Sequence, residues 1–453
     1  MLPPSLSSVY EHIQSNQEAF IQRLMDYVRH PSISAHDIGI REVSEILVEM
    51  LTKIGLETRT LATAGHPMVL GRWEKSPGAP TVLLYGHYDV QPPDPLEEWI
   101  SPPFEPTIRD GRIYARGVGD NKGQHLAQIL AIESHLQVHG KLPCNIIVLL
   151  EGEEEIGSPH IADFVREHRE ILNADLVITA DGHVHNTGTP VLKYGVRGVA
   201  SFELRARGAN RDVHSGNYGG VVPNPIWTLI HLLASMKNER GEVTIEGFHD
   251  RVIPPTPAEL VTVAGLPLDL EGLKAELDLE QFDQPLERPF YDRLMFHPTF
   301  TINGFHGGYG GPGSKTVLPH EAVVKCDIRL VEAQTPDEIL EKVRVHVKRV
   351  APGVDFIPLD GMLPSKTPMD SPFATPLRQA ITTAQGVVPL EYPCTGGSLP
   401  DYVFTKILNI PAFVTPYGNA DESNHAPNEN LALDCFINGI RTGAAVLTYL
   451  GAM

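Results

Sequence analysis

The chain has 453 residues, of which 42% are hydrophobic and 20% are charged, and it carries a formal net charge of −20 at pH 7. This length exceeds what one ordinary core accommodates, so we expect two domains. The acidic charge argues against nucleic acid and anionic membranes as partners, because either would require a basic face.

The first residues, Met1 to Ser5, lack the basic region and apolar core of a signal peptide. No stretch approaches the roughly 20 apolar residues of a membrane helix. We therefore expect a cytoplasmic protein. Residues from about 7 to 54 are predicted to form two helices, because apolar residues recur there at helical spacing.

A short apolar run from Pro80 to Val90 is predicted to form a strand buried on both faces of a parallel sheet. Its far end carries His87 and Asp89. Ligands in open α/β sheets bind outside the carboxyl ends of such strands. One of the two residues could ligate a cation while the other orients it, although a core histidine and a capping aspartate would give the same pattern.

The segment from Arg112 to Gly123 precedes a predicted helix, 124 to 139, and contains Gly117-x-Gly119. Two features argue against a dinucleotide-binding loop: Asp120 stands where a pyrophosphate would approach, and the third glycine is one place late. The aspartate indicates a positively charged ligand.

Two more predicted strands, 145 to 150 and 175 to 181, also end in acids. The first leads into Glu153-Glu154-Glu155, and three adjacent acids repel one another unless a cation or a shared proton intervenes. The second ends at Asp181. A further apolar run, 410 to 416, precedes His425, and a final amphipathic helix then packs on the sheet.

Residues from about 193 to 365 differ in pattern. Amphipathic strands are predicted at 199 to 206, 299 to 302 and 322 to 331, with helices at 224 to 236 and 336 to 350. We interpret this stretch as an inserted α+β domain whose sheet is covered on one face by two helices. The other domain comprises 1–192 and 366–453, an α/β domain with a mixed sheet and helices on both faces.

The acids and histidines at the strand ends are weak signals singly, but together they form a set that suits metal binding. Two imidazoles with several carboxylates fit divalent zinc, manganese or cobalt. A pair of such ions would need a bridging carboxylate, and a spare carboxylate could then carry a proton. The set is His87, Asp89, Asp120, Glu154, Glu155, Asp181 and His425.

In order and spacing, these residues resemble the metal-binding pattern of the peptidase M20 family, which includes carnosinase-like cytosolic dipeptidases, carboxypeptidases and aminoacylases. The resemblance covers essentially the whole chain. Segments closer to the dipeptidase branch are Trp99-x-Ser101-Pro102-Pro103-Phe104, Asp212-x-His214-Ser215-Gly216, Lys315-Thr316-Val317-x-Pro319 and Gly396-Gly397-Ser398-x-Pro400.

The resemblance implies a zinc-peptidase-like catalytic domain with two divalent metal ions, zinc first and manganese or cobalt as alternatives. Asp120 would bridge the ions. His87 and Asp181 would complete one metal site, and Glu155 and His425 the other.

Glu154 would be the general base, and Asp89 would orient His87. A cis peptide is expected after Asp120. The register follows Gly157-Ser158, although Glu153 with Glu154 stays an alternative pair.

The resemblance further implies that the inserted domain is a lid and dimerisation domain. His214 would reach the partner subunit's site in a homodimer and bind the carbonyl oxygen. Arg329 would bind the substrate carboxylate, with Thr316 and Ser398 as further substrate contacts. The reaction implied is hydrolysis of a dipeptide amide bond by an activated water, without a covalent intermediate.

Several alternatives remain at this point. The activity could be that of an N-acyl amino acid amidohydrolase, or the chain could be a non-catalytic binding protein on the same fold. A dipeptidase must also bind a free α-amine, for which Glu153 or Asp421 are candidates. His183 and His185 could ligate metal, although a surface loop is the simpler interpretation.

Two further features have simple structural interpretations. The glycine-rich stretch 304–313 has Ser314 where a phosphate-binding loop needs glycine, and it is expected to be a lid loop. The four cysteines form no C-x-x-C pair, and we expect buried free thiols.

Overall fold

The computed structural model describes residues 3–282 and 289–453 and divides into two compact units. Unit 1 comprises Met1–Gly195, Lys366–Pro393 and Pro400–Met453, and unit 2 comprises Val196–Ser365 and Cys394–Leu399. The sequence placed the short segment Cys394–Leu399 with the first domain. The structure groups it with unit 2 instead, because its contacts lie there.

In the described residues, unit 1 is built on an eight-stranded mixed sheet with the order β1-β2-β6-β3-β7-β18-β8-β17. Strand β3 lies between β6 and β7 and runs parallel to both, and β18 runs parallel to β7. The strands are β1 (Glu57–Leu61), β2 (Met68–Trp73), β3 (Thr81–His87), β6 (Asn145–Glu151), β7 (Leu176–Thr179), β8 (Val191–Lys193), β17 (Leu390–Tyr392) and β18 (Ala412–Val414).

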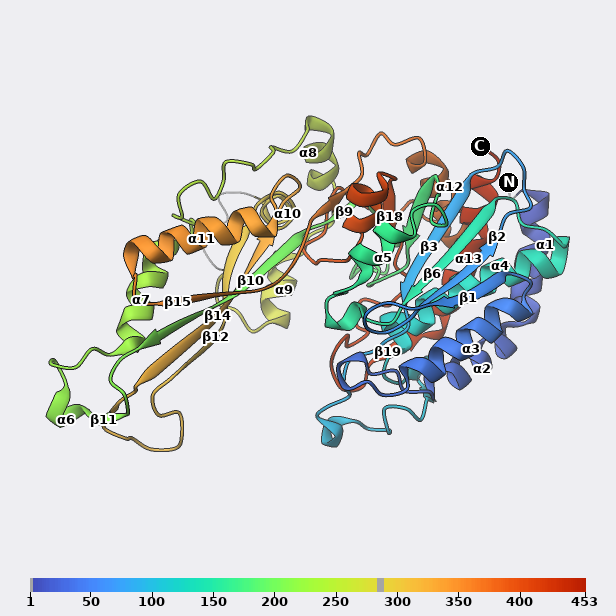
Figure 1. Ribbon diagram of the computed structural model, residues 1–453. Helices are drawn as coiled ribbons and strands as arrows, with labels where there is room; N and C mark the ends of the chain where they lie inside the picture. The colour runs from blue at the N-terminus through green and yellow to red at the C-terminus, as the bar shows by residue number, and fades with distance from the viewer. Residues whose placement is uncertain (1–2, 283–288) are drawn as a thin grey trace. The chain divides into compact units, whose positions relative to one another are not determined.

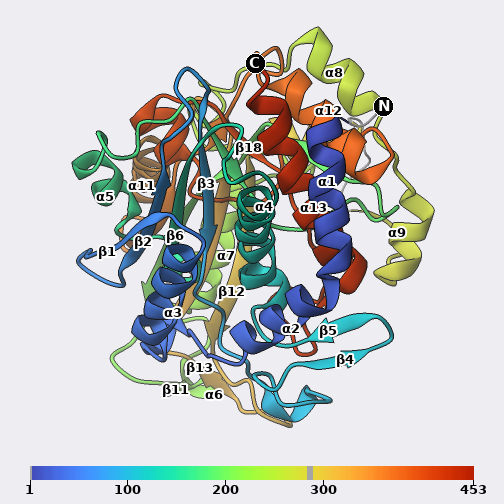
Figure 2. The same cartoon turned by 90° about the vertical axis from the view of Figure 1, so that its right-hand side faces the viewer.

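Helices cover both faces of this sheet (Figure 1 and Figure 2). Alternate residues of β3 divide between two cores: Val82 and Leu84 pack under the larger helical layer, whereas Leu83 and Tyr85 face α5 and the short helical segment η5 (Val403–Leu408). This division is expected for a strand buried on both faces. The helices are α1 (Pro4–Ser15), α2 (Gln17–Val28), α3 (Ile40–Lys53), α4 (Gly123–His139), α5 (Ile161–Glu167), α12 (Ala374–Gln385) and α13 (Leu433–Leu450).

The prediction of two helices between residues 7 and 54 was wrong, since the structure has three. Helix α1 ends at Ser15, and α2 begins at Gln17. Asn16 has a non-helical ψ of 10°, and its side-chain amide donates a hydrogen bond to the His12 carbonyl. The break is invisible in the apolar spacing because Ile13 and Phe20 are both buried.

A small three-stranded sheet, β19-β5-β4, also belongs to unit 1. Strand β19 (Asn430–Ala432) pairs with β5 (Arg112–Tyr114), which pairs with β4 (Thr107–Arg109). This pairing joins the segment after His425 to the segment before Asp120. Within the described residues, no helix is long and apolar enough to cross a membrane.

Unit 2 contains a four-stranded antiparallel sheet with the order β12-β14-β10-β15 and its own core. Helices α7 (Pro225–Met236) and α11 (Pro336–Val350) pack on it, and burial alternates along β10 as expected for a sheet covered on one face. The strands are β10 (Gly198–Arg207), β12 (Thr299–Gly307), β14 (Glu321–Leu330) and β15 (Asp355–Met362).

The remaining elements of unit 2 are short. They are β11 (Val213–His214), β13 (Val317–Leu318), α6 (Ser215–Tyr218), α8 (Pro257–Ala264), α9 (Leu270–Glu276) and α10 (Phe290–Phe296). Strands β9 (Gly195–Val196) and β16 (Ser365–Lys366) stand where the chain passes from one unit to the other.

Candidate metal centre

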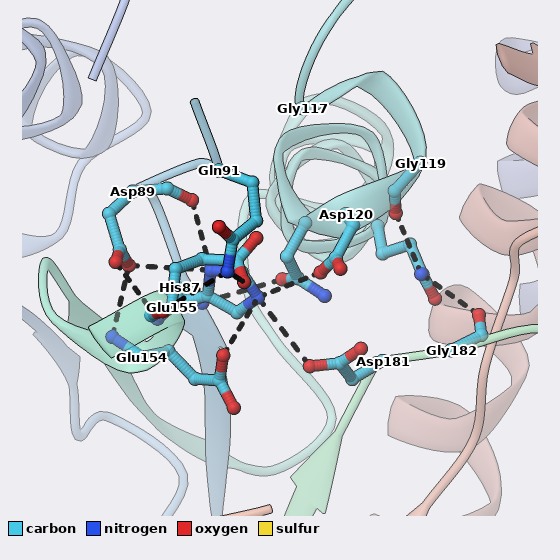
Figure 3. Close-up of polar contacts among 12 residues, drawn as sticks. His87, Asp89, Gln91, Gly117, Gly119, Asp120, Glu154, Glu155, Asp181 and Gly182 are labelled. Atoms are coloured by element: carbon cyan, nitrogen blue, oxygen red, sulfur yellow. Dashed lines mark hydrogen bonds and ion pairs between the residues drawn. The ribbon is translucent and has the colours of Figure 1, made fainter. Parts of the chain in front are cut away.

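Most of the predicted metal-binding residues gather at one edge of the unit 1 sheet, where Figure 3 labels His87, Asp120, Glu155 and Asp181. His425 contacts Asp120 and Glu155 of this group. His87 is the last residue of β3, and Asp181 follows β7 by two positions. Glu154 and Glu155 lie in a one-turn helix, η4 (Glu154–Ile156), directly after β6. Because β3, β6 and β7 are parallel, their carboxyl ends meet at this edge.

Asp120 stands at the centre of the group and faces two imidazoles. Its Oδ1 lies 3.0 Å from His87 Nε2, and its Oδ2 lies 3.1 Å from His425 Nε2. Each oxygen is thus directed at a different histidine, which is the geometry that a bridging carboxylate needs. The peptide bond from Asp120 to Asn121 is cis, as expected.

The donors form two groups that share Asp120. His87, Asp120 and Asp181 make one group, and Asp120, Glu155 and His425 make the other, with the ligand atoms of each group within 4.8 Å of one another. Imidazole nitrogens and carboxylate oxygens, with no thiolate, fit zinc, manganese or cobalt. The donor set therefore suits two divalent cations held by five side chains.

Asp89 anchors the turn that carries Glu154 and Glu155. Its carboxylate accepts hydrogen bonds from the backbone N–H groups of Glu154, at 3.1 Å, and Glu155, at 3.0 Å. His87 Nδ1 lies 3.1 Å from the Asp89 carbonyl and 3.4 Å from its carboxylate. Asp89 thus contacts both His87 and the acidic turn, and the second contact was not anticipated from the sequence.

Burial and neighbouring charges shift the proton affinities of the group. Burial, then Asp181, Glu155 and Asp120, raise the pKa of Glu154 well above its usual value, although His87 opposes this. Hydrogen bonds to Asp120 and Glu155 raise the pKa of His425 to about 10. Buried titratable groups whose pKa values are shifted by one another cluster at functional sites.

Asp120 and His87 each shift the pKa of the other. Burial by itself would raise the pKa of Asp120, but hydrogen bonds from His425 and His87 hold it well below the usual range. For His87, burial opposes protonation, yet hydrogen bonds to Asp120, Asp181 and Asp89 raise the pKa. The surrounding carboxylates thus favour positive charge on the imidazoles of His87 and His425.

Glu153 points away from this group. Its carboxylate accepts from the His66 backbone N–H at 3.0 Å and lies 2.7 Å from His160 Nδ1. It ties the acidic turn to the loop before β2. Asp421 is also engaged, with Arg112 at 2.8 Å and Asn419 at 2.9 Å. The two acids suggested for a substrate amine therefore already have partners.

The sequence reasoning missed several residues of this region. Gln91 Nε2 donates to Glu155 Oε2 at 2.9 Å. Glu422 is buried, and burial with the nearby Asp120, Glu429 and Asp181 raises its pKa to about 9. Glu422 does not follow a predicted strand directly, so its nearness in sequence to His425 was the signal that could have identified it.

The predicted substrate-binding residues belong to unit 2, where they form two pairs. Arg329 Nη1 donates to Ser398 Oγ at 2.8 Å. His214 Nε2 lies 3.4 Å from Thr316 Oγ1, and its Nδ1 accepts from the Gly216 N–H at 2.9 Å. His214 is exposed.

The remaining candidate residues have ordinary surroundings. His183 is exposed, and its Nδ1 bonds to the Val184 carbonyl, whereas His185 Nδ1 bonds to Thr187. Cys144, Cys326 and Cys435 are free thiols, and the buried cysteines are Cys144, Cys326 and Cys394.

The fold and the site together define a class of protein: an α/β protein in which paired imidazole and carboxylate groups, with one shared aspartate, meet at the carboxyl edge of a mixed sheet. The model of peptidase family M20/M25/M40 matches residues 83–449, and the chain belongs to this family. The predicted family and fold are thereby confirmed, and with them the expectation of a peptide-bond hydrolase.

Relatives match over nearly the whole chain. The Cys-Gly metallodipeptidase of Schizosaccharomyces pombe is 31% identical, covering 96% of each chain, and the human Beta-Ala-His dipeptidase is 27% identical, covering 98% of this chain and 92% of its own length. The crystal structure of an M20 family metallo-carboxypeptidase from Sulfolobus solfataricus has a TM-score of 0.91 at 33% identity, covering 96% of this chain and 99% of the other.

Proposed function

We propose that this protein is a dipeptidase that hydrolyses the amide bond of its substrate with two divalent metal ions. The observation that carries the proposal is the pair of donor groups that share Asp120. The substrate class is supported by the two relatives that are named dipeptidases and match 96% or more of the chain.

In this proposal His87, Asp120 and Asp181 hold one cation, and Asp120, Glu155 and His425 hold the other. The proposed cation is zinc, with manganese or cobalt as alternatives. All three accept imidazole and carboxylate ligands. When bound, two such cations would lower the pKa of a water between them and polarise the carbonyl of the substrate.

Glu154 is proposed as the general base. Its Oε2 lies 4.0 Å from His87 Nε2, beside the first donor group, and its side chain is largely buried. Its raised pKa means that its carboxylate is a stronger base than an exposed glutamate, as is needed to accept the proton of the attacking water and return it to the leaving amine. Asp89 fixes this base by holding the backbone of its turn.

The change Glu154→Gln tests this role. A positioned general base contributes about 10²- to 10⁴-fold to the rate, so we expect kcat to fall by at least that range while two metal ions still bind. Calorimetric titration of metal into chelated protein, beside steady-state kinetics, measures both quantities. Turnover within a few-fold of the wild type would remove Glu154 from the mechanism.

The unit 2 residues are proposed to bind substrate. Arg329, held by Ser398, would pair with the substrate carboxylate through its guanidinium. The Gly216 N–H donates a hydrogen bond to Nδ1 of His214. Nδ1 is therefore the acceptor nitrogen, and the proton of the neutral ring is assigned to Nε2. That tautomer can donate a hydrogen bond to a carbonyl oxygen or an oxyanion, with Thr316 beside it.

We further propose a homodimer in which His214 completes the partner's site. Strand β12 is one of the two edge strands of the unit 2 sheet and exposes Ile302 and Phe305, and α7 exposes Trp227 and Ile230. An edge strand with exposed apolar residues favours pairing with another chain. A second copy of this chain is the occupant that would also bring in His214.

Mixing two inactive variants tests the shared site. A His214→Ala chain retains its own base, and a Glu154→Gln chain supplies an intact His214, so we expect the mixture to regain activity that neither variant shows by itself. The mass in solution, measured by light scattering, should be that of two chains. A monomer, or a mixture as inactive as its components, would contradict the shared site.

A substrate panel separates dipeptidase activity from the alternatives. Dipeptides, the same dipeptides with a blocked amine, and tripeptides should be assayed with zinc, manganese and cobalt added to chelated protein. We expect free dipeptides to be cleaved fastest. Preference for the blocked forms would indicate an N-acyl amino acid amidohydrolase, and no turnover with any metal would indicate a binding protein.

We place this activity in the cytoplasm. Cys144, Cys326 and Cys435 are free thiols, and Cys144 and Cys326 are buried. Free thiols are typical of a reducing compartment.

A further inference from the structure

The loop before α4 surrounds a carboxylate with backbone N–H groups. Glu429 Oε1 accepts from the N–H groups of Gly119, at 2.9 Å, and Asp120, at 3.0 Å. Glu429 Oε2 accepts from the Gly117 N–H at 2.9 Å and from Arg116 Nη1 at 2.8 Å. Successive N–H groups that converge in this way form an anion-binding nest.

The anion in this nest is the protein's own. The sequence argued against a dinucleotide-binding loop at Gly117-x-Gly119, and in the structure the N–H groups of this loop bind the carboxylate of Glu429, more than 300 residues along the chain. Glu429 and Arg116 are each only 1% exposed. A carboxylate this deeply buried is tolerated only when hydrogen bonds satisfy it, and four donors do so here.

The same contacts fix the backbone of Asp120, whose two side-chain oxygens face His87 and His425 at 3.0 and 3.1 Å. A bridging ligand must be held close to its working geometry by its surroundings. We propose that Glu429 is a positioning residue for the bridging aspartate. This inference rests on the proposed two-metal function.

Arg116 offers a competing, purely structural explanation, namely that Glu429 only neutralises a buried guanidinium. Arg116 also donates to the Pro92 carbonyl at 3.3 Å and lies over the Trp99 ring. The two explanations differ in one respect. Removing both charges would relieve a structural pair, but it would leave the N–H groups of Gly117, Gly119 and Asp120 without their carboxylate.

The test titrates Co²⁺ into chelated full-length protein and follows heat and the visible absorption of the bound ion. In Glu429→Gln the amide NH₂ replaces one acceptor and faces N–H donors. Loss of such supporting contacts typically costs 10- to 100-fold in metal affinity or activity. We expect metal affinity to fall by that range with an altered Co²⁺ spectrum, and kcat to fall while KM changes little.

Two further variants make the test specific. Arg116→Met/Glu429→Gln should regain stability against heat but retain the weakened Co²⁺ binding. Glu391→Gln is the matched control, because it breaks another ion pair of unit 1. Glu391 lies on β17, and its carboxylate accepts hydrogen bonds from the Arg378 guanidinium at 2.8 and 3.0 Å. It should lose stability and bind Co²⁺ as the wild type does.

Wild-type Co²⁺ affinity and spectrum in Glu429→Gln, or their recovery in the double variant, would overturn the inference. If Glu429→Gln does not fold, Glu429→Asp keeps the charge but is one methylene shorter, and it should show intermediate affinity; wild-type binding there would equally overturn it. Failure of the wild type to cleave dipeptides while binding two Co²⁺ ions would refute the proposed substrate and leave this inference standing.

Discussion

Glu151, the last residue of β6, shows how single buried charges set the properties of this protein. It is fully buried, and its Oε2 accepts from Tyr85 Oη at 2.5 Å. Burial, the largest effect, raises the pKa of Glu151 to about 8. The folded protein therefore holds a proton on Glu151 at pH values where the unfolded chain has lost it.

The raised pKa of Glu151 makes the stability of the fold depend on pH. Between pH 4.5, the usual value, and about 8, the folded state binds the extra proton, so this residue lowers the free energy of unfolding as pH rises. Glu151→Gln, which keeps an acceptor for Tyr85, should remove that decline. We expect a gain on the order of a few kcal/mol at pH 8 and little change at pH 4.5.

Denaturant unfolding of metal-free protein at a series of pH values measures this. Parallel pH profiles for the wild type and Glu151→Gln would show that the carboxyl is ionised in the folded state.

At the scale of elements, the turn from Gly117 to α4 depends on glycine for two separate reasons. Gly117 has a φ of +81°, and a Cβ at this position would lie 2.3 Å from Val90 Cγ1. The left-handed backbone disfavours any L side chain, and the neighbouring strand end leaves no room for one. Both restrictions act on the loop that carries Asp120.

Gly117→Ala should therefore cost more than the backbone term of roughly 1–2 kcal/mol in the free energy of unfolding, and it should weaken metal binding. Gly140→Ala is the control, since Gly140 has a φ of +66° but nothing within 4 Å of an added Cβ. Denaturant titration of both variants compares them. Equal losses would mean that the contact with Val90 relaxes at little cost.

At the scale of the whole molecule, the proposed metal ligands all belong to unit 1, whereas unit 2 has a separate hydrophobic core. A ligand that binds only the folded state stabilises it, by about 4 kcal/mol at a free concentration 1,000 times its Kd. Because each unit has its own core, this stabilisation should act mainly on unit 1.

Hydrogen exchange with and without chelator tests this expectation. Removing metal should speed exchange at the amides of β3, β6 and β7 and leave those of β10 and β14 nearly unchanged. Equal acceleration in both units would indicate that they unfold as one cooperative body.

The sequence by itself determined the strands that lead to the site, the order of the ligands and the family, because these depend on local apolar patterns and on spacing. His87 and Asp181 each stand at the end of such a pattern. Only the tertiary structure decided which acids face the centre: Glu154 turns toward it, whereas Glu153 turns toward His66 and His160. The side chains of neighbouring residues in a turn point in different directions because their partners lie far along the chain. The same holds for Glu429 and the loop at Gly117. Local sequence patterns do not predict such distant partners.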